Sequence, residues 1–522
     1  MSDDGYDCDV LVCGLGPVGA LLALLLGRRG ISVIAVERAP EPYPLPRAAV
    51  VDDEVLRIFQ SAGVVEQILA DAQIQEEVSF VTVGGRKILL MRPVDGTQGH
   101  SPLVSINQPS LERTLGAAVA ETPSVDVRRE HELERLEQDP GGVTATVRPL
   151  GEEPGTIRAR WAVGCDGSAS LVRRLLGIEY SGSTFERWLV VDVLVDRPLA
   201  KVPHPHFFGD WRRPTVSLPM SPGRHRWEWM LHHGEEEAPF LDPEALRERI
   251  EPWLQGESAE IERAVVYTFH ARMATRWREG RVLLAGDAAH VTPPFAGQGF
   301  SSGARDAVNL AWKLEAELAG APEALLDSYE AERRPHVAAM IRLALGLGKF
   351  VQTRRRAVAA LRDAYLTAMD VSGAAEWLQS RIKPIPAYGE GAFAVKPHAF
   401  PPKRSVGSQF PQPSVADAAA DGEEPLDERI GWGWCAIASD PATAAALGAE
   451  GLPVLTLGAD LRDPEGAIDA WFGRFGVDWV VLRPDRFVFA AGTGGAEVPA
   501  ALAELHRRIG RGLVAAKPHL RP

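Results

Sequence analysis

The stretch 281–313 carries the residue types best suited to chemistry in this chain. An apolar run, which predicts a buried strand, ends there at Gly286-Asp287. The carboxylate of Asp287 can accept hydrogen bonds from polyol hydroxyls, and Gly297 and Gly299 let the backbone approach a ring. The helix predicted after them would offer its first N–H groups to a forming anion. The stretch therefore indicates a site for a planar, electron-accepting group, with a plain buried strand-to-helix connection as the alternative.

A glycine triplet near the start of the chain, Gly14-x-Gly16-x-x-Gly19, indicates dinucleotide binding. Gly14 permits a tight turn, Gly16 lets the backbone approach a pyrophosphate, and Gly19 lets helix and strand pack closely. Glu37 would accept hydrogen bonds from ribose hydroxyls. The pattern around the triplet predicts a strand, a helix and a second strand, at 7–13, 17–29 and 31–36. This is the setting that the fingerprint requires.

Composition limits the classes that remain. A length of 522 residues predicts two or three domains, and 45% hydrophobic residues support well-formed cores. A net charge of −14 argues against nucleic acid and anionic membranes as partners, and no apolar run has transmembrane length. The four cysteines lack the spacing of a metal site or a redox pair, which predicts free thiols, no metal and a cytoplasmic location.

Aromatic residues gather in the region 183–275. Alternation along 224–231 places His225, Trp227 and Trp229 on one face of a predicted strand, and Phe208 lies in the same region. These side chains could form the buried face of a sheet or a wall of an aromatic-substrate pocket. His290 has two similar interpretations, as an acid–base group or as a histidine packed beneath a cofactor.

Three motifs in order resemble the single-component FAD-dependent aromatic hydroxylases, the family that contains p-hydroxybenzoate hydroxylase and phenol hydroxylase. They are the glycine triplet with Glu37, the segment 164–173 with Asp166-Gly167, and Gly286-Asp287. Within that family the chain also resembles the 3-(3-hydroxyphenyl)propionate hydroxylases. That similarity lies in segments 46–57, 108–112, 188–192, 297–300, 305–313 and 481–487.

The resemblance implies an α/β fold, in which a Rossmann-type FAD-binding domain is interleaved with a mixed β-sheet substrate domain. It also implies long helices and a C-terminal thioredoxin-like domain. That domain has no C-x-x-C here, so packing or a homodimer contact remains as its role. The predicted divisions are FAD-binding domain 1–182, substrate sheet 183–275, FAD-binding domain with helices 276–385, linker 386–425 and C-terminal domain 426–522.

The resemblance also assigns roles to residues. It implies cofactor contacts from Gly14, Gly16, Pro17, Val18, Gly19, Glu37, Arg38, Arg47, Gln108, Asp166, Gly286, Asp287, Pro294, Gly297, Gln298 and Gly299. It gives the catalytic candidates as Pro293, Gly297 and His290, and the substrate-binding candidates as Phe208, His225, Trp227 and Trp229. A substrate carboxylate would need a cation, and the candidates near the predicted sheet are Arg224, Arg226 and Arg272.

The implied activity is an NAD(P)H-consuming monooxygenase that hydroxylates a phenol with O2 through a flavin C4a-hydroperoxide. The expected substrate is a phenol with a short acidic side chain, of the 3-hydroxyphenylpropionate type. Tailoring of a polycyclic aromatic polyketide is the alternative. A binding protein with an FAD fold and no turnover is a third interpretation, which the intact Asp166-Gly167 and Gly286-Asp287 motifs disfavour.

Overall fold

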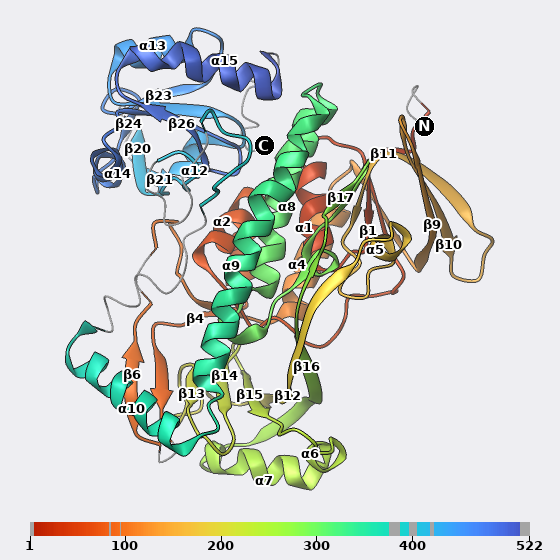
Figure 1. Ribbon diagram of the computed structural model, residues 1–522, viewed down its shortest axis with the longest axis vertical. Coiled ribbons are helices and arrows are strands. Elements are labelled where there is room, and N and C mark those ends of the chain that lie inside the picture. Colours follow the sequence, from red (N-terminus) through yellow and green to blue (C-terminus); the bar gives the residue numbers. More distant parts are fainter. Residues whose placement is uncertain are drawn as a thin grey trace.

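The computed structural model describes residues 5–82, 85–93, 96–374, 387–395, 405–417 and 422–511. Figure 1 shows one sheet beside long central helices, a second sheet below them and the C-terminal unit above. Within the described ranges, no helix combines the length and apolar character that a membrane span would need.

The first sheet has a parallel centre, in which β1 lies between β11 and β2. β18 and β8 extend it in parallel, and β17, β10 and β9 are added in antiparallel pairing. β1 is buried almost throughout, as expected for a central strand of a covered parallel sheet. The bounds are β1 (Cys8–Cys13), β2 (Val33–Glu37), β8 (Val125–Arg129), β9 (His131–Asp139), β10 (Gly142–Pro149), β11 (Gly155–Gly164), β17 (Arg278–Glu279) and β18 (Val282–Leu284).

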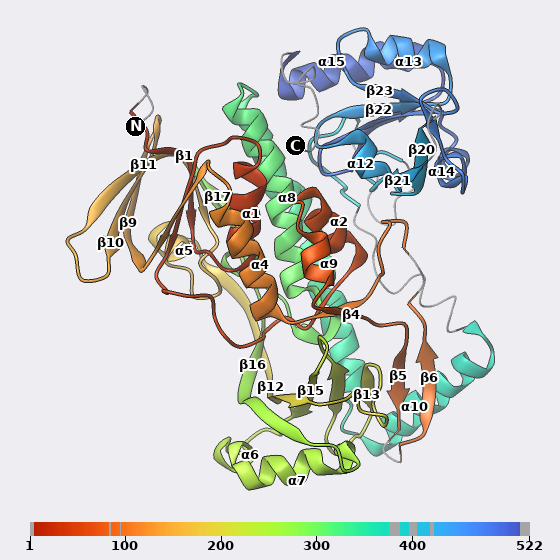
Figure 2. The same ribbon diagram turned by 180° about the vertical axis from the view of Figure 1, so that it is seen from behind.

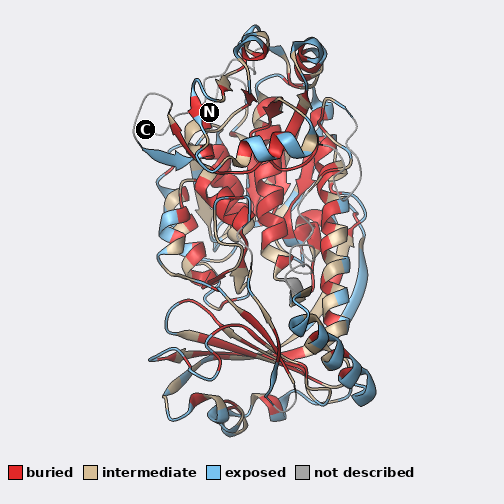
Figure 3. Ribbon diagram, turned by 90° about the vertical axis from the view of Figure 1, so that its left-hand side faces the viewer, coloured by how far each residue is buried: buried red, intermediate tan, exposed pale blue. Residues whose placement is uncertain are grey.

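Buried residues are concentrated in the central helices and the sheet beside them (Figure 3). α1 (Pro17–Gly27) has no charged residue, so it is buried on nearly every side where it packs against α4 and α8. The other central helices are α2 (Asp53–Ser61), α3 (Val65–Leu69), α4 (Gln108–Ala120), α8 (Gln298–Leu318) and α9 (Asp327–Val351). Two helices lie outside this group: α5 (Leu171–Leu175) contacts β9, and α10 (Arg356–Val371) packs beside β6 (Lys87–Met91) of the second sheet (Figure 1). A small sheet joins β3 (Val50–Val51), β7 (Val104–Ile106) and β4 (Ala72–Ile74).

The second sheet has the strand order β19-β16-β12-β15-β14-β13-β5-β6. It takes β5 and β6 from the first hundred residues, so it extends beyond the predicted range 183–275; Figure 2 shows these strands beside β13. α6 (Ala238–Leu241) and α7 (Pro243–Leu254) pack on one face. The bounds are β5 (Val78–Val81), β6 (Lys87–Met91), β12 (Tyr180–Val195), β13 (His206–Phe208), β14 (Thr215–Pro219), β15 (Arg224–Met230), β16 (Ala259–Ala274) and β19 (His290–Val291).

The C-terminal unit contains a four-stranded sheet, β23-β22-β25-β26, with cores on both sides. The structure describes residues 387–395, 405–417 and 422–425 of the predicted linker. The stretch 405–417 is largely buried and includes β20, so it belongs to this unit, whereas 422–425 is exposed. The thioredoxin-like character stays a prediction. The bounds are β20 (Ser414–Asp417), β21 (Glu423–Pro425), α12 (Leu426–Ile430), β22 (Cys435–Ala438), α13 (Pro441–Gly448), β23 (Val454–Thr456), β24 (Leu461–Arg462), α14 (Ala467–Phe475), β25 (Trp479–Leu482), β26 (Val488–Gly492) and α15 (Val498–Ile509).

Candidate active site

A cavity of about 900 Å³ extends from the carboxyl ends of the parallel strands to the second sheet. Ligands of open parallel sheets bind at that edge. We call its first part the glycine end, lined by Gly14, Gly16, Glu37, Arg47, Asp166, Asp287, Gly297 and Gly299. We call its other part the sheet end, lined by Val78, Phe207, Val216, Leu218, Arg226 and Glu228.

The turn after β1 has the geometry that its glycines suggested. Gly14 has a φ of +97°, and a Cβ there would lie 2.7 Å from the carbonyl oxygen of Cys165. A Cβ on Gly19 would lie 2.0 Å from the Gly14 carbonyl oxygen, so Gly19 closes the turn from behind and does not line the cavity. A Cβ on Gly16 would meet nothing within 4 Å. Gly16 therefore presents bare backbone to open space in the cavity.

Glu37 supports this turn with its carboxylate. Its Oε2 accepts a hydrogen bond from the Leu15 N–H at 2.9 Å, and its Oε1 accepts one from the Ala39 N–H at 2.9 Å. The carboxylate lines the cavity at the end of β2. The lining also includes three other residues that were predicted to contact the cofactor, Pro17, Val18 and Arg38. The predicted ribose acceptor thus also fixes the glycine loop.

Arg47 and Gln108 lie together, although they are far apart in sequence. The Gln108 Oε1 accepts hydrogen bonds from the backbone N–H groups of Arg47 at 3.1 Å and Ala48 at 2.5 Å. The guanidinium of Arg47 lies 4.4 Å from the ring centroid of Tyr43 and lines the cavity. Gln108 therefore positions the loop that brings a cation to the glycine end.

Asp166 and Asp287 both reach the cavity, but their carboxylates differ. Asp166 Oδ2 accepts from the N–H groups of Leu171 at 2.6 Å and Val172 at 3.1 Å, at the start of α5. Its Oδ1 is buried and has no hydrogen-bond partner among the described residues. The Asp287 side chain is exposed, but it faces the cavity and not the outer surface. The protein around the cavity shields it from bulk water, and this desolvation raises the pKa of its carboxyl group.

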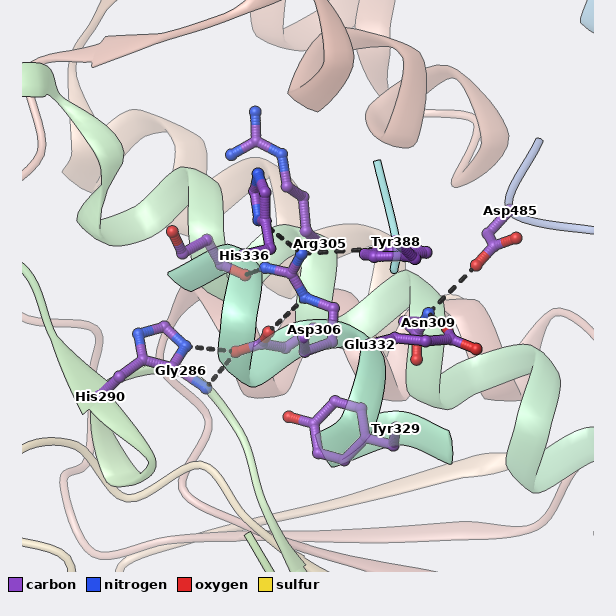
Figure 4. Close-up of polar contacts among 12 residues, drawn as sticks. Gly286, His290, Arg305, Asp306, Asn309, Tyr329, Glu332, His336, Tyr388 and Asp485 are labelled. Atoms are coloured by element: carbon purple, nitrogen blue, oxygen red, sulfur yellow. Dashed lines mark hydrogen bonds and ion pairs between the residues drawn. The ribbon is translucent and has the colours of Figure 1, made fainter. Parts of the chain in front are cut away.

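His290 lies behind the cavity, in a buried charged network (Figure 4). Its Nε2 lies 2.6 Å from Asp306 Oδ2, which also accepts from the Gly286 N–H at 3.1 Å. Arg333 Nε donates to Asp306 Oδ1 at 2.8 Å. His290 and Gly286 are therefore held outside the cavity lining, and the catalytic prediction for His290 is replaced by a positioning role for the Gly286-Asp287 turn.

The turn before α8 is also held by a buried charged network outside the cavity. Gly297 adopts the left-handed region, with a φ of +63°, and lines the cavity with Pro294 and Gly299. Gln298 points away from the cavity, where its Nε2 donates to Asp52 Oδ2 at 3.1 Å and its Oε1 accepts from Arg305 Nη1 at 2.9 Å. Arg305 also forms ion pairs with Asp52 and Glu54.

Pro293, a predicted catalytic residue, is buried and lies outside the cavity lining. Its neighbours Thr292 and Pro294 line the cavity instead.

At the sheet end the aromatic residues predicted as substrate-binding candidates lie on the face away from the cavity, in agreement with the alternative that they form the buried face of a sheet. His225, Trp227 and Trp229 alternate with Arg226 and Glu228 along β15, so the two sets point to opposite sides. Both tryptophans pack in the core beneath α7, and His225 Nε2 lies 2.7 Å from Ser217 Oγ. Their apolar bulk makes them core residues, and Arg226 and Glu228 line the cavity.

Phe208 departs from its prediction for the same reason. It packs with the cluster beneath α7, while Phe207 lines the cavity. The alternation along each strand separates the residues of one face from those of the other. The sequence does not say which of the two faces meets the cavity.

The three arginines proposed as carboxylate partners do not supply a free cation. Arg224 pairs with Glu262 at 3.5 Å and Arg272 donates to Thr184 Oγ1 at 3.3 Å, and both lie outside the cavity lining. Arg226 lines the cavity, but its guanidinium donates to Asp192 Oδ1 at 2.6 Å and to two backbone carbonyl oxygens.

Comparison with known proteins decides the family. Residues 7–344 match the family described as FAD binding domain, and residues 407–508 match the HcaD C-terminal domain. The chain belongs to the FAD-binding aromatic hydroxylase family. It is 36% identical to a 3-(3-hydroxy-phenyl)propionate/3-hydroxycinnamic acid hydroxylase of Mycobacterium sp. (strain JLS), over 94% of this chain and 90% of the relative.

Two further members of the family are similar over nearly the whole chain. A probable NADH-specific resorcinol 4-hydroxylase of Rhodococcus jostii (strain RHA1) is 35% identical, over 95% of this chain and 94% of that protein. The crystal structure of aklavinone-11 hydroxylase with FAD and aklavinone has a TM-score of 0.78 at 26% identity, and covers 97% of this chain and 99% of that one.

This member of the family is an FAD-dependent aromatic hydroxylase that uses NAD(P)H. The glycine end fits the flavin nucleotide, because bare backbone at Gly16 and Gly299 leaves open space there. The partnerless Asp166 Oδ1 gives that space a buried acceptor, and Arg47 brings a cation to it.

Proposed function

We propose that the protein hydroxylates a monocyclic phenol at the carbon next to its existing hydroxyl group. The observation that carries this proposal is the continuity of the cavity, in which the glycine end opens onto an apolar sheet end. Val216, Leu218 and Phe207 offer a surface suited to an aromatic ring, and Glu228 offers an acceptor for its hydroxyl.

At the glycine end we assign FAD to the bare backbone of Gly14 and Gly16, the carboxylates of Glu37 and Asp287, and the cation of Arg47. When bound, FAD supplies the redox chemistry, taking electrons from NAD(P)H and activating O2. The chain's own groups orient the reactants and exclude water. The N-terminus of α8, behind Gly297 and Gly299, favours negative charge that develops in front of it.

For the substrate, the relatives' names support 3-(3-hydroxyphenyl)propionate or 3-hydroxycinnamate as the first compounds to test. Resorcinol is the second candidate, because Arg226 is already bonded to Asp192 and leaves no free cation for a carboxylate in the described lining of the sheet end. The named resorcinol hydroxylase supports the same candidate. The predicted homodimer remains untested.

The test is NAD(P)H oxidation together with product analysis, for purified holoenzyme with 3-(3-hydroxyphenyl)propionate, resorcinol and a tetracyclic phenol. We expect stoichiometric catechol or trihydroxybenzene formation from a monocyclic phenol, and faster oxidation with one of the two reduced nicotinamides. Hydroxylation of the tetracyclic phenol alone would overturn the substrate proposal and leave the hydroxylase activity intact. Oxidation without hydroxylated product from any phenol would overturn both.

A further inference from the structure

Glu228 is the acidic side chain of the sheet end. It lies on β15, directly opposite Val190 of β12 and Val216 of β14. Its side chain is 17% exposed, and it lines the cavity. Within the described parts of the chain, no donor forms a hydrogen bond to its carboxylate; the nearest cation is Arg226, whose Nη1 lies 3.9 Å away.

Arg226 is engaged elsewhere. It donates to Asp192 through Nε at 2.6 Å and through Nη2 at 3.1 Å. It also donates to the carbonyl oxygens of Pro46 at 2.9 Å and Arg47 at 3.0 Å. Arg226 therefore clamps the loop that carries Arg47, and it is only a distant counter-ion for Glu228.

Other charges around Glu228 come from the neighbouring strands. Asp192 lies on β12 opposite Arg226, two residues along from the position opposite Glu228, and Arg263 on β16 lies 3.7 Å from Asp192. The neighbours on the β14 side of the cavity, Val216 and Leu218, are apolar. Burial is the main cause that raises the pKa of Glu228; Arg226 lowers it and Asp192 raises it further. A carboxylate in such surroundings gains from a hydrogen-bond donor supplied by a ligand.

We propose that Glu228 binds the phenolic hydroxyl of the substrate and takes its proton. The substrate O–H bond breaks, an O–H bond forms on the Glu228 carboxylate, and the negative charge moves to the phenolate oxygen. No electrons are transferred in this step. The phenolate ring is more electron-rich at its ortho carbon, and Arg226 remains near the displaced charge. After the ring carbon has been hydroxylated, it loses its own proton to water and the ring regains its aromatic character; Glu228 then returns the first proton to the product oxygen.

This assignment rests on the proposed phenol hydroxylation and deepens it. A carboxylate that only balanced Arg226 would affect stability and the Arg47 loop. A proton acceptor would instead control how binding and rate depend on pH and on substrate acidity. These two roles can therefore be separated by experiment.

The test compares Glu228→Gln with Glu262→Gln, which removes a carboxylate from the same sheet outside the cavity lining. The first readout is phenol binding to oxidised holoenzyme, followed between pH 5 and 9 by the absorbance of bound FAD. The second is kcat/KM over the same pH range, with 3-hydroxyphenylpropionate and its more acidic ring-fluorinated analogues. Melting temperature and FAD content are measured for every variant.

We expect Glu228→Gln to lower kcat/KM about 100-fold, the lower range for general-base catalysis. The loss of rate at low pH, where Glu228 is protonated, should disappear in this variant. Fluorinated phenols should lose less than the parent because they ionise more easily. Glu228→Asp should retain the acidic limb with a shifted midpoint, and Glu262→Gln should behave as the wild type.

An unchanged pH profile and an unchanged kcat/KM in Glu228→Gln would overturn the assignment. If Glu228→Gln fails to fold, an unshifted acidic limb in Glu228→Asp would overturn it equally. A wild type that binds phenols without hydroxylating them would refute the proposed function, while its binding titration would still test Glu228.

Discussion

The two ends of the cavity differ in the groups that line them: backbone at the glycine end and side chains at the sheet end. At the glycine end a ligand would meet backbone, because Gly16 and Gly299 carry no side chain into the open space. At the sheet end it meets side chains from one face of a β-sheet, among them Leu218 and Glu228. Backbone surfaces need glycines at fixed spacing, which a sequence shows directly. Side-chain surfaces depend on which face of a sheet meets the ligand, which a sequence shows only as two equal choices.

The support behind the two ends also differs. Asp306, buried at 0% exposure, holds the Gly286 N–H and pairs with His290 and Arg333. Glu228 at the sheet end has no such set of partners in the described chain. Buried charged side chains thus hold the glycine end in place. At the sheet end, the carboxylate of Glu228 is left available to accept a hydrogen bond.

The largest effect should follow from removing the support of the glycine end. Asp306→Ala leaves Arg333 buried without its carboxylate and frees the Gly286 turn, at a cost of about 3–5 kcal/mol in the free energy of unfolding. FAD should also dissociate faster.

Asp427→Ala is the matched control, because Asp427 is a buried partner of Arg57 and Arg486 and does not line the cavity. Urea unfolding and FAD dissociation are measured for both variants. Equal FAD retention in the two would contradict the positioning role of Asp306.

Acid should weaken a second group of buried ion pairs, those around Glu332. Glu332 accepts from both Nη atoms of Arg483 and pairs with Lys313, and the pKa of its carboxyl is lowered from 4.5 to about 2. The unfolded chain takes up this proton first, so the stabilisation is full above about pH 4.5 and is lost as the pH falls towards about 2. The loss should be on the order of 3 kcal/mol.

Urea unfolding at pH 7, 4.5 and 3 checks this prediction. Glu332→Gln should be less stable at neutral pH and should lose less on acidification. A variant with the wild-type pH dependence would show that other carboxylates dominate acid unfolding.

Gly16→Val should separate cofactor binding from folding. Gly16 has an ordinary φ of −69°, and a Cβ there meets no protein atom within 4 Å, so the side chain enters the cavity without strain. FAD affinity should fall about 100-fold, or roughly 2.7 kcal/mol, at nearly unchanged apoprotein stability.

Gly116→Val is the control, since Gly116 in α4 also has open space around its Cβ but does not line the cavity. FAD titration of the apoproteins gives the comparison. Wild-type FAD binding by Gly16→Val would place the cofactor elsewhere.

The smallest effect concerns the two faces of the second sheet. Leu218→Trp fills the sheet end, and phenol affinity should fall about tenfold, or roughly 1.4 kcal/mol, with FAD retained. Trp227→Phe on the opposite face should lower stability by about 1–3 kcal/mol and leave phenol affinity unchanged. Titration of holoenzyme with phenol measures both. A loss of affinity in Trp227→Phe alone would reverse the assignment of faces.

The contrast between the glycine end and the sheet end also explains which parts of the site could be predicted from the sequence. The glycine triplet, Glu37 and Asp287 identified one end, because their chemistry depends on spacing along the chain. Trp227 and Trp229 kept two interpretations, because aromatic character suits a core as well as a pocket, and the structure places both in the core. The role of His290 depended on Asp306 and Arg333, partners that only the packing of α8 on α9 brings together.

The C-terminal unit shows the same limit. The sequence predicts a linker over 386–425 because of its prolines and the small and acidic residues that follow them, and the segment 405–417 lies within that range. It is buried instead, and Phe410 packs in the core of the unit. Burial of a proline-rich segment depends on tertiary contacts, which local composition does not encode.

The central claim is that one face of the second sheet and the glycine end form a single site. A crystal structure of the holoenzyme with bound 3-(3-hydroxyphenyl)propionate tests it most directly. We predict FAD along Gly16 and Asp287, and the phenol ring against Val216 and Leu218 with its hydroxyl directed to Glu228. A ring bound on the α7 side, against Trp227 and Trp229, would contradict the account.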